Sequence, residues 1–214
     1  ALGVNKECKD IFWNQGLTLM LAGEFEKALP LLEFRWRSEK FRDSKRIFTA
    51  PKWTGQEPLG GKTILLHSEQ GLGDSIQFCR YINLFKKWDC KVLLEVETPL
   101  ISIMSSLVPS DQIYSKNTEL PDFDYHCPLM SLAWAFDTNE KSIPAETPYI
   151  TVDQKVVHKW ARKLGKKERP RIGFCWQGNK LHQRDKVRSL PITTLLPHLH
   201  YGFDWICLQK ELTD

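Results

Sequence analysis

The chain has 214 residues and a formal net charge of +4, with 42% hydrophobic and 26% charged residues. This length suits one large domain, or a small module with parts of others. The modest positive charge is spread along the chain and does not indicate a nucleic-acid or membrane-surface protein. No apolar segment is long enough to span a bilayer and no signal peptide opens the chain, so we expect no transmembrane segment and a cytoplasmic location.

The cysteines are scattered, several of them inside apolar runs, and no CxxC pair occurs. This pattern favours reduced cysteines in the core over a disulfide framework or a zinc site. The six are Cys8, Cys79, Cys90, Cys127, Cys175 and Cys207.

The first 48 residues predict a pair of helices. Apolar residues recur at helical spacing over 7–22, Gly23 ends that helix, and a second apolar pattern runs from Phe25 to Trp36 with Pro30 inside it. A basic, poorly periodic linker, 35–46, follows. The pair resembles one tetratricopeptide repeat (TPR), which cannot bury its own face and would end an array or cap the next domain. The matching residues are Trp13, Gly16, Phe25 and Ala28.

The stretch 62–81 predicts a strand, a glycine turn and a helix. The apolar run 63–66 is typical of a buried parallel strand, and Gly71 and Gly73 would allow backbone angles that other residues resist. Asp74 would cap the following helix, with Gln77 completing a capping box. Ligands in open α/β sheets collect outside the carboxyl ends of the strands, where this turn lies.

The remainder of 49–152 continues the alternation of strands and helices. It predicts a Rossmann-like α/β domain, a parallel sheet with helices on both faces, and Pro144 and Pro148 mark its end. The expected segments are strand 91–97, helix 100–107, short strand 112–115, strand 124–127 and helix 129–136.

Residues 153–214 predict the start of a second Rossmann-like domain that is incomplete here. The chain begins at Ala1 without an initiator Met and ends just after a strand-like segment, so we expect it to be part of a longer protein. The expected segments are a basic helix 153–167, a strand 171–176, a polar loop 177–188, a helix from Pro191 and a strand 205–208.

A dinucleotide site at the glycine turn is one hypothesis. Gly71 and Gly73 supply two of the three fingerprint glycines, and Glu95 or Glu97 could imitate the ribose-binding acid. However, Ile76 stands where the third glycine belongs, and an acid at the helix start would repel a pyrophosphate. The pattern therefore fits a nicotinamide-dependent oxidoreductase poorly.

Asp74 has two alternative roles. A carboxylate at the mouth of the sheet, favoured by the helix dipole, could accept a proton from an attacking hydroxyl. It could equally do no more than cap the helix. The residues alone leave both roles open.

The loop after strand 171–176 is a candidate phosphate site. It is rich in cations, and it lies between a strand and a helix N-terminus. A solvated basic loop is the alternative. Its candidate residues are Gly178, Asn179, Lys180, Arg184 and Arg188.

Three further polar residues, His67, Glu69 and His126, fall near strand ends. A lone histidine in such a place is more often a hydrogen-bonded structural residue than a catalyst. No pair of them has the spacing of metal ligands.

Residues 69–78, with Arg80 and Tyr81, resemble the signature of bacterial TPR proteins fused to a heptosyltransferase-like glycosyltransferase (family 9-like, GT-B). The likeness covers nearly the whole chain, and the EQGLGDSIQF run is its most specific part. Its other elements are Pro51, Trp53 and Gly55; Leu120, Pro121 and Asp124; Ile143, Pro144, Pro148, Tyr149 and Ile150; Ile172, Gly173, Trp176, Gly178, Asn179, Asp185, Arg188 and Ser189; and Leu208, Gln209 and Lys210.

The resemblance implies an inverting, metal-independent transferase with its active site between two Rossmann-like domains. Asp74 matches the catalytic base of the family, with Gly71, Gly73 and Gln77 on the acceptor side. The basic loop after residue 176 would hold the phosphates of a nucleotide-sugar, which is a substrate, so no cofactor is expected.

The acceptor would be a glycan, a lipid-linked compound or a protein, and the TPR-like helices could bind a protein partner. Much of the donor domain is missing, so this chain alone would lack a complete donor site. The alternative is a non-catalytic interaction or scaffold module.

Overall fold

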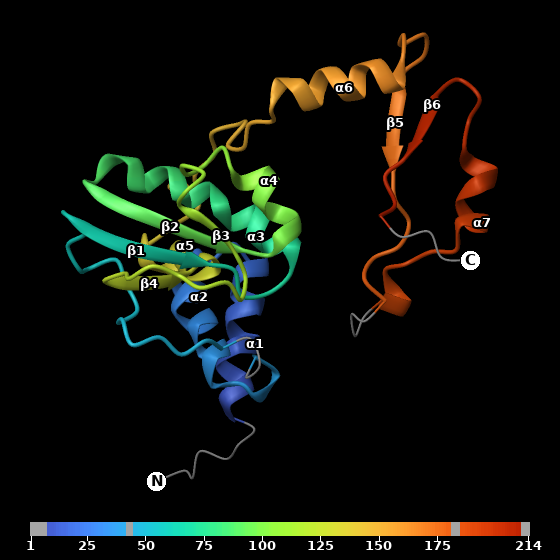
Figure 1. Cartoon of the computed structure of the whole chain (residues 1–214). Helices are drawn as coiled ribbons and strands as arrows, with labels where there is room; N and C mark the ends of the chain where they lie inside the picture. The colour runs from blue at the N-terminus through green and yellow to red at the C-terminus, as the bar shows by residue number, and fades with distance from the viewer. Residues whose placement is uncertain (1–7, 42–44, 181–184, 211–214) are drawn as a thin grey trace. The chain divides into compact units, whose positions relative to one another are not determined.

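The computed structural model describes residues 8–41, 45–180 and 185–210 (Figure 1). The chain divides into two compact units, Ala1–Val152 and Asp153–Asp214, and each is described by itself. None of the described helices is both long and apolar enough to cross a membrane.

The first unit opens with two packed helices, α1 (Cys8–Leu21) and α2 (Phe25–Leu32). Gly23, at φ +79°, makes the turn between them, as expected. A side chain at Gly16 would meet Leu32, so this glycine allows the helices to approach closely. Pro30 lies within α2, which ends at Leu32 and continues as a 3-10 helix, η1 (Glu33–Arg37), followed by η2 (Glu39–Phe41).

The sheet of the first unit has four parallel strands in the order β3-β2-β1-β4, so the expected α/β, Rossmann-like parallel sheet is present. From β1 the chain moves outward to β2 and β3, and then crosses back to β4 on the other side of β1. The carboxyl ends of β1 and β4 therefore flank a topological switch point. The strands are β1 (Lys62–His67), β2 (Cys90–Val96), β3 (Ile113–Ser115) and β4 (Tyr125–Pro128).

Short helices join the strands, and each α-helix continues into or from a 3-10 turn. The helices predicted over 100–107 and 129–136 are therefore present but less regular than expected. The segments are α3 (Leu72–Phe78) with η3 (Cys79–Lys87), η4 (Thr98–Leu100) with α4 (Ile101–Met104), and η5 (Leu129–Ser131) with α5 (Leu132–Ala135).

One face of the sheet, including Ile64 and Leu66, joins these helices in the main hydrophobic core. Trp53 lies in this core with only 1% of its surface exposed, and Trp53 N–H donates to the carbonyl of His126, so its segment runs along β4. Gly55 has φ +96°, and a side chain there would overlap the backbone of Ala135. Only glycine fits this position.

The opposite face of the sheet also buries leucines. At the carboxyl end of the strands, an extended segment that carries Arg46 and Phe48, called the strap below, lies against this face. Arg46 forms an ion pair with Glu95 on β2. The ring of Phe48 contacts the rings of His67 on β1 and His126 on β4, at centroid distances of 5.2 and 4.7 Å. We expected helices on both faces, and at this end an extended strap takes their place.

The second unit forms a strand–helix–strand arrangement with two parallel strands, as the sequence predicts. Its first helix ends at Leu164, three residues earlier than expected, and Asp153 caps it. None of its described residues is fully buried. Its segments are α6 (Gln154–Leu164), β5 (Arg171–Phe174), η6 (Asp185–Val187), α7 (Ile192–Leu195), η7 (Leu196–His198) and β6 (Asp204–Cys207).

The cysteines divide between the two units. Cys79 and Cys127 are buried free thiols in the core, as expected, and burial raises the pKa of Cys79 to about 12. Cys175 and Cys207 are exposed, so the expectation of core cysteines is wrong for this pair. Each lies at the end of a strand in the second unit, where few other residues pack over the strands. The apolar residues next to these cysteines in sequence therefore do not bury them.

Candidate functional site

The glycine turn after β1 starts its helix earlier than the sequence suggests. Gly71 is the N-cap of α3, and Asp74 is the third helical residue. The Asp74 carboxylate accepts a hydrogen bond from Gly71 N–H at 3.0 Å, and Gln77 is exposed without a capping role. Asp74 is therefore the last member of a capping motif and not the first, which corrects the predicted capping box.

The glycines of this turn do not adopt special backbone angles. Gly71 has φ −77°, and Gly73 is helical because the helix begins at Leu72. A side chain at Gly73 would meet nothing, whereas one at Gly71 would come within 3.2 Å of Asp74 Oδ2. The expectation that both glycines supply unusual angles is wrong. Gly71 instead leaves room for the Asp74 carboxylate.

The second oxygen of this carboxylate, Asp74 Oδ1, has no partner among the residues that the structure describes. Asp74 is half-buried at the first turn of α3, where the helix dipole favours a negative charge. One oxygen therefore caps the helix while the other remains able to accept a proton. The geometry allows both roles that the sequence left open.

Glu69, just before the turn, is held by Arg35 of η1. The Arg35 guanidinium donates from Nε and Nη2 to the two Glu69 oxygens, both at 3.0 Å, and the side chains are almost fully buried. Arg35 also donates to Glu33 at 2.6 Å and to Ser131 Oγ at 2.8 Å. Lys52 completes the cluster with an ion pair to Glu33. This cluster fastens the helix pair to the sheet domain.

Burial and charge pairing shift the pKa values of this cluster in opposite directions. Burial raises the pKa of Glu69. Burial would also raise the pKa of Glu33, but Arg35 and Lys52 hold it below its ordinary value. For Arg35, burial lowers the pKa, and the carboxylates of Glu69 and Glu33 more than offset this. Arg35, predicted as the first residue of a basic linker, is thus one of the most buried side chains of the unit.

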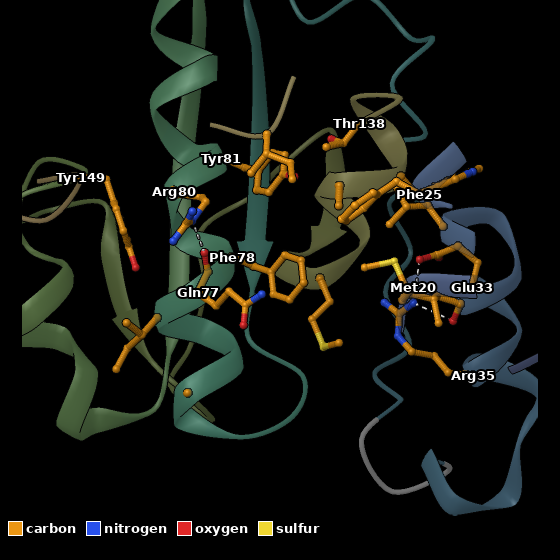
Figure 2. Close-up of a pocket in the computed structure, with 18 residues that line it drawn as sticks. Met20, Phe25, Glu33, Arg35, Gln77, Phe78, Arg80, Tyr81, Thr138 and Tyr149 are labelled. Atoms are coloured by element: carbon orange, nitrogen blue, oxygen red, sulfur yellow. Dashed lines mark hydrogen bonds and ion pairs between the residues drawn. The ribbon is translucent and has the colours of Figure 1, made fainter. Parts of the chain in front are cut away.

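A cavity of about 400 Å³ opens beside the turn, between the helix pair and the α3–η3 and α5 segments (Figure 2). Figure 2 shows Met20 and Phe25 of the helix pair facing Gln77 and Phe78 across it. Gly73 and Gln77, predicted to bind substrate, line this cavity, while Gly71 and Asp74 do not. The remaining lining is largely apolar, so the cavity suits an apolar group.

His67 and His126 meet at the carboxyl edge of the sheet, with His67 Nε2 3.1 Å from His126 Nδ1. Burial and the neighbouring His126 lower the pKa of His67 to about 3. Burial and the Lys52 and Arg46 cations lower the pKa of His126 to about 4. Both imidazoles are therefore neutral near pH 7. From the sequence we expected each histidine to be a separate, hydrogen-bonded structural residue, and the contact between them was not predicted.

In the candidate phosphate loop of the second unit, Gly178 and Arg188 lie close to each other and contact the neighbouring residues Ser189 and Asp185. Gly178 N–H donates to Ser189 Oγ at 3.0 Å, and that hydroxyl donates to Asp185 at 2.6 Å. The Arg188 guanidinium lies within 2.5 Å of where a Gly178 side chain would be, and its Nε is 3.6 Å from Asp185. Gly178 is therefore needed for the approach of Arg188.

The other predicted residues of this loop are Lys180, Asn179 and Arg184. Lys180 is exposed and has no ion-pair partner within the described part of the chain, and Asn179 is exposed as well. Arg184 lies outside the described residues. Within 8–41, 45–180 and 185–210, no group of three or more His, Cys, Asp or Glu residues is placed to hold a metal ion.

Comparisons with known proteins give one distant relative. Protein FlbA of Caulobacter vibrioides is 22% identical over 191 residues, which cover 77% of this chain and 32% of that protein. The chain thus spans about a third of the length of the curated relative it matches. No family model and no solved structure matched the chain.

Proposed function

We propose that the protein is an inverting, metal-independent glycosyltransferase of the heptosyltransferase-like GT-B kind. It would move a sugar from a nucleotide-sugar to an acceptor hydroxyl, with Asp74 as the base. The observation that carries the proposal is the turn after β1, which holds Asp74 beside residues lining an apolar cavity at the carboxyl edge of a parallel sheet. The chain spans only part of its relative, so the activity is proposed for the whole protein.

The catalytic step assigned to Asp74 follows from its two oxygens. Oδ2 stays bonded to Gly71 N–H and fixes the side chain, while Oδ1 accepts the proton of the acceptor hydroxyl. The freed oxygen attacks the anomeric carbon of the donor as the bond to the diphosphate breaks. The nucleoside diphosphate leaves with that electron pair, and the sugar configuration inverts.

The cavity of Figure 2 is the proposed place for part of the acceptor. Its walls combine Met20 and Phe25 of the helix pair with Phe78 and Tyr81 of the sheet domain. Apolar walls favour a lipid-linked or polypeptide acceptor over a free glycan, because a sugar has little apolar surface to bury. The TPR-like helices then act as a fixed wall of the substrate site, held in place by Arg35.

The donor phosphates are assigned to the loop after β5. Arg188 lies against Gly178 and carries donors beyond the one directed at Asp185, which suits a diphosphate. Lys180 and Asn179 are the further proposed contacts, together with Arg184.

The alternative function is a non-catalytic TPR and Rossmann-like scaffold. Two acidic residues near the turn after β1 have structural roles that support this alternative. Glu69 is fully paired with Arg35, and one oxygen of Asp74 caps α3. A module that needs only a rigid joint between helices and sheet would use the same residues.

Asp74→Asn tests the transferase. An asparagine oxygen can still accept from Gly71, so we expect the melting temperature to stay nearly unchanged while turnover falls by about 10²–10⁴, the usual contribution of a general base. A thermal-shift panel of nucleotide-sugars on the full-length protein first identifies the donor, and release of nucleoside diphosphate then measures turnover.

Asp111→Asn is the matched control, because Asp111 is exposed and its backbone carbonyl, not its carboxylate, bonds Tyr114. Full turnover in Asp74→Asn would remove the base assignment. A panel in which no nucleotide-sugar raises the melting temperature would favour the scaffold.

A further inference from the structure

A second cavity, of about 630 Å³, lies at the carboxyl ends of β1 and β4. It is lined by Trp36 of η1, by the strap that carries Arg46 and Phe48, and by the paired His67 and His126. None of Gly71, Gly73, Asp74 or Gln77 contributes to it. It occupies the topological switch point of the sheet, where ligands of open α/β folds bind, and its volume suits a small molecule.

The charged residues of the described lining have one sign. Lys45, Arg46 and Lys52 line the cavity, and no carboxylate from the described part of the chain does. Arg46 and Lys52 form ion pairs with Glu95 and Glu33 behind the surface, whereas exposed Lys45 has no ion-pair partner in the part of the chain that the structure describes. A ligand entering this cavity therefore meets cations that attract an anion.

The apolar part of the lining is aromatic. Phe48 contacts both histidine rings, and the Arg46 guanidinium lies over the Phe48 ring, 4.7 Å from its centroid. Flat aromatic and imidazole faces provide contact surface for a ring. The cavity thus combines attraction for an anion with a surface for a ring-shaped body.

Two buried nitrogens in the lining lack hydrogen-bond partners among the described residues. They are Trp36 Nε1, which can only donate, and His67 Nδ1. His67 is 3% exposed. Because neutral His67 and His126 share one hydrogen bond, a tautomer exists in which His67 Nδ1 carries a proton and donates. Buried polar atoms without partners are rare, and a bound ligand is one of their explanations.

We propose that this cavity binds a small ring compound carrying a carboxylate or phosphate group. Trp36 Nε1 and His67 Nδ1 would donate to its polar atoms, the cations would hold the acidic group, and the Phe48 surface would support the ring. This site is separate from the proposed transfer at Asp74, and binding here does not depend on turnover.

The test uses benzoate and phenyl phosphate as probes and benzamide as the uncharged control. Each is titrated into the protein at low salt while the imidazole NMR signals are followed. We expect a Kd of the order of 1 mM for at least one anion, the range for fragments of this size. The His67 and His126 signals should shift, while those of the exposed His158, His198 and His200 stay fixed. The tighter-binding anion identifies the acidic group.

Two variants connect binding to the cavity. Trp36→Phe keeps the ring beneath Arg35 but removes the donor, and we expect roughly tenfold weaker binding. Lys45→Gln should weaken binding and reduce its dependence on salt, with the exposed Lys86→Gln as control. The proposal is overturned if benzamide binds as well as the anions, if no probe shifts the two histidines at about 10 mM, or if both variants bind like the parent. Asp74→Asn should bind the anions normally.

Discussion

The loops that follow β1 and β5 hold the two halves of the proposed chemistry, and the protein fixes them in opposite ways. After β1, Glu69 is locked by Arg35 in a pair whose side chains are each 2% exposed. After β5, Asp185 gathers Ser189 and Arg188, but the Arg188 side chain remains 44% exposed. A buried pair defines one position of the chain, whereas an exposed cluster keeps its cation available to solvent and ligands.

This difference fits the tasks proposed for the two loops. A base must be placed precisely before the acceptor arrives, so a rigid loop suits Asp74. Phosphate groups are held mainly by charge, and accessible cations serve that purpose even in a loosely packed unit.

Removing the Arg35–Glu69 ion pair, the lock of the first loop, should have the largest effect on the free energy of unfolding. Arg35→Met would leave Glu69 buried without its ion-pair partner and would remove one of the two cations that pair with Glu33, so we expect a loss of about 3–5 kcal/mol in the free energy of unfolding. Urea denaturation followed by tryptophan fluorescence measures this change.

The neighbouring Arg37 provides the control for this prediction. It is exposed in the same 3-10 helix and stacks on Phe34, so Arg37→Met should cost less than about 1 kcal/mol. Equal losses in the two variants would show that Arg35 does not lock the loop and would remove the contrast with the loop after β5.

Lowering the pH should reduce the free energy of unfolding by a smaller amount than Arg35→Met does, through the two histidines at the carboxyl edge of the sheet. The pKa values of His67 and His126 fall to about 3 and 4 in the folded protein, so below about pH 6.5 the unfolded chain takes up protons that the folded one does not. Stability from this pair is complete above that pH and falls as the pH decreases. At about pH 5.5 we expect the two histidines together to cost about 2–3 kcal/mol relative to pH 7.

His67→Gln isolates this effect, because it removes the group whose pKa moves most. Comparing the two proteins also cancels the contribution of Glu69, whose raised pKa acts with the opposite sign. Identical slopes of unfolding free energy against pH in the parent and the variant would contradict the prediction.

Local patterns predicted the elements of this fold well. Apolar runs identified β1 and β2 because buried parallel strands are continuous in hydrophobicity, and Gly23 marked its turn. The start of α3 was misplaced because an acid at the third helical position and an acid at the N-cap look alike in sequence. That distinction depends on the preceding backbone.

The lock and the histidine pair could not be predicted in the same way, because each joins residues far apart in the chain. Arg35 and Glu69 are 34 positions apart, and His67 and His126 are 59 apart. One signal was available: Arg35 lies seven residues after buried Ala28, on the same side of a helical pattern. A charged residue at an apolar position requires a buried partner.

The smallest expected effect on stability concerns the loop after β5. Asp185→Asn keeps an oxygen that can accept from Ser189 but removes the negative charge beside Arg188. We expect less than about 1 kcal/mol of change in stability, since the cluster is partly exposed. Binding of a nucleoside diphosphate should become severalfold tighter, because the carboxylate no longer competes for the guanidinium. Calorimetry with Arg188→Ala as the opposite control decides this: if neither substitution changes the affinity, the cations of this loop do not hold the donor.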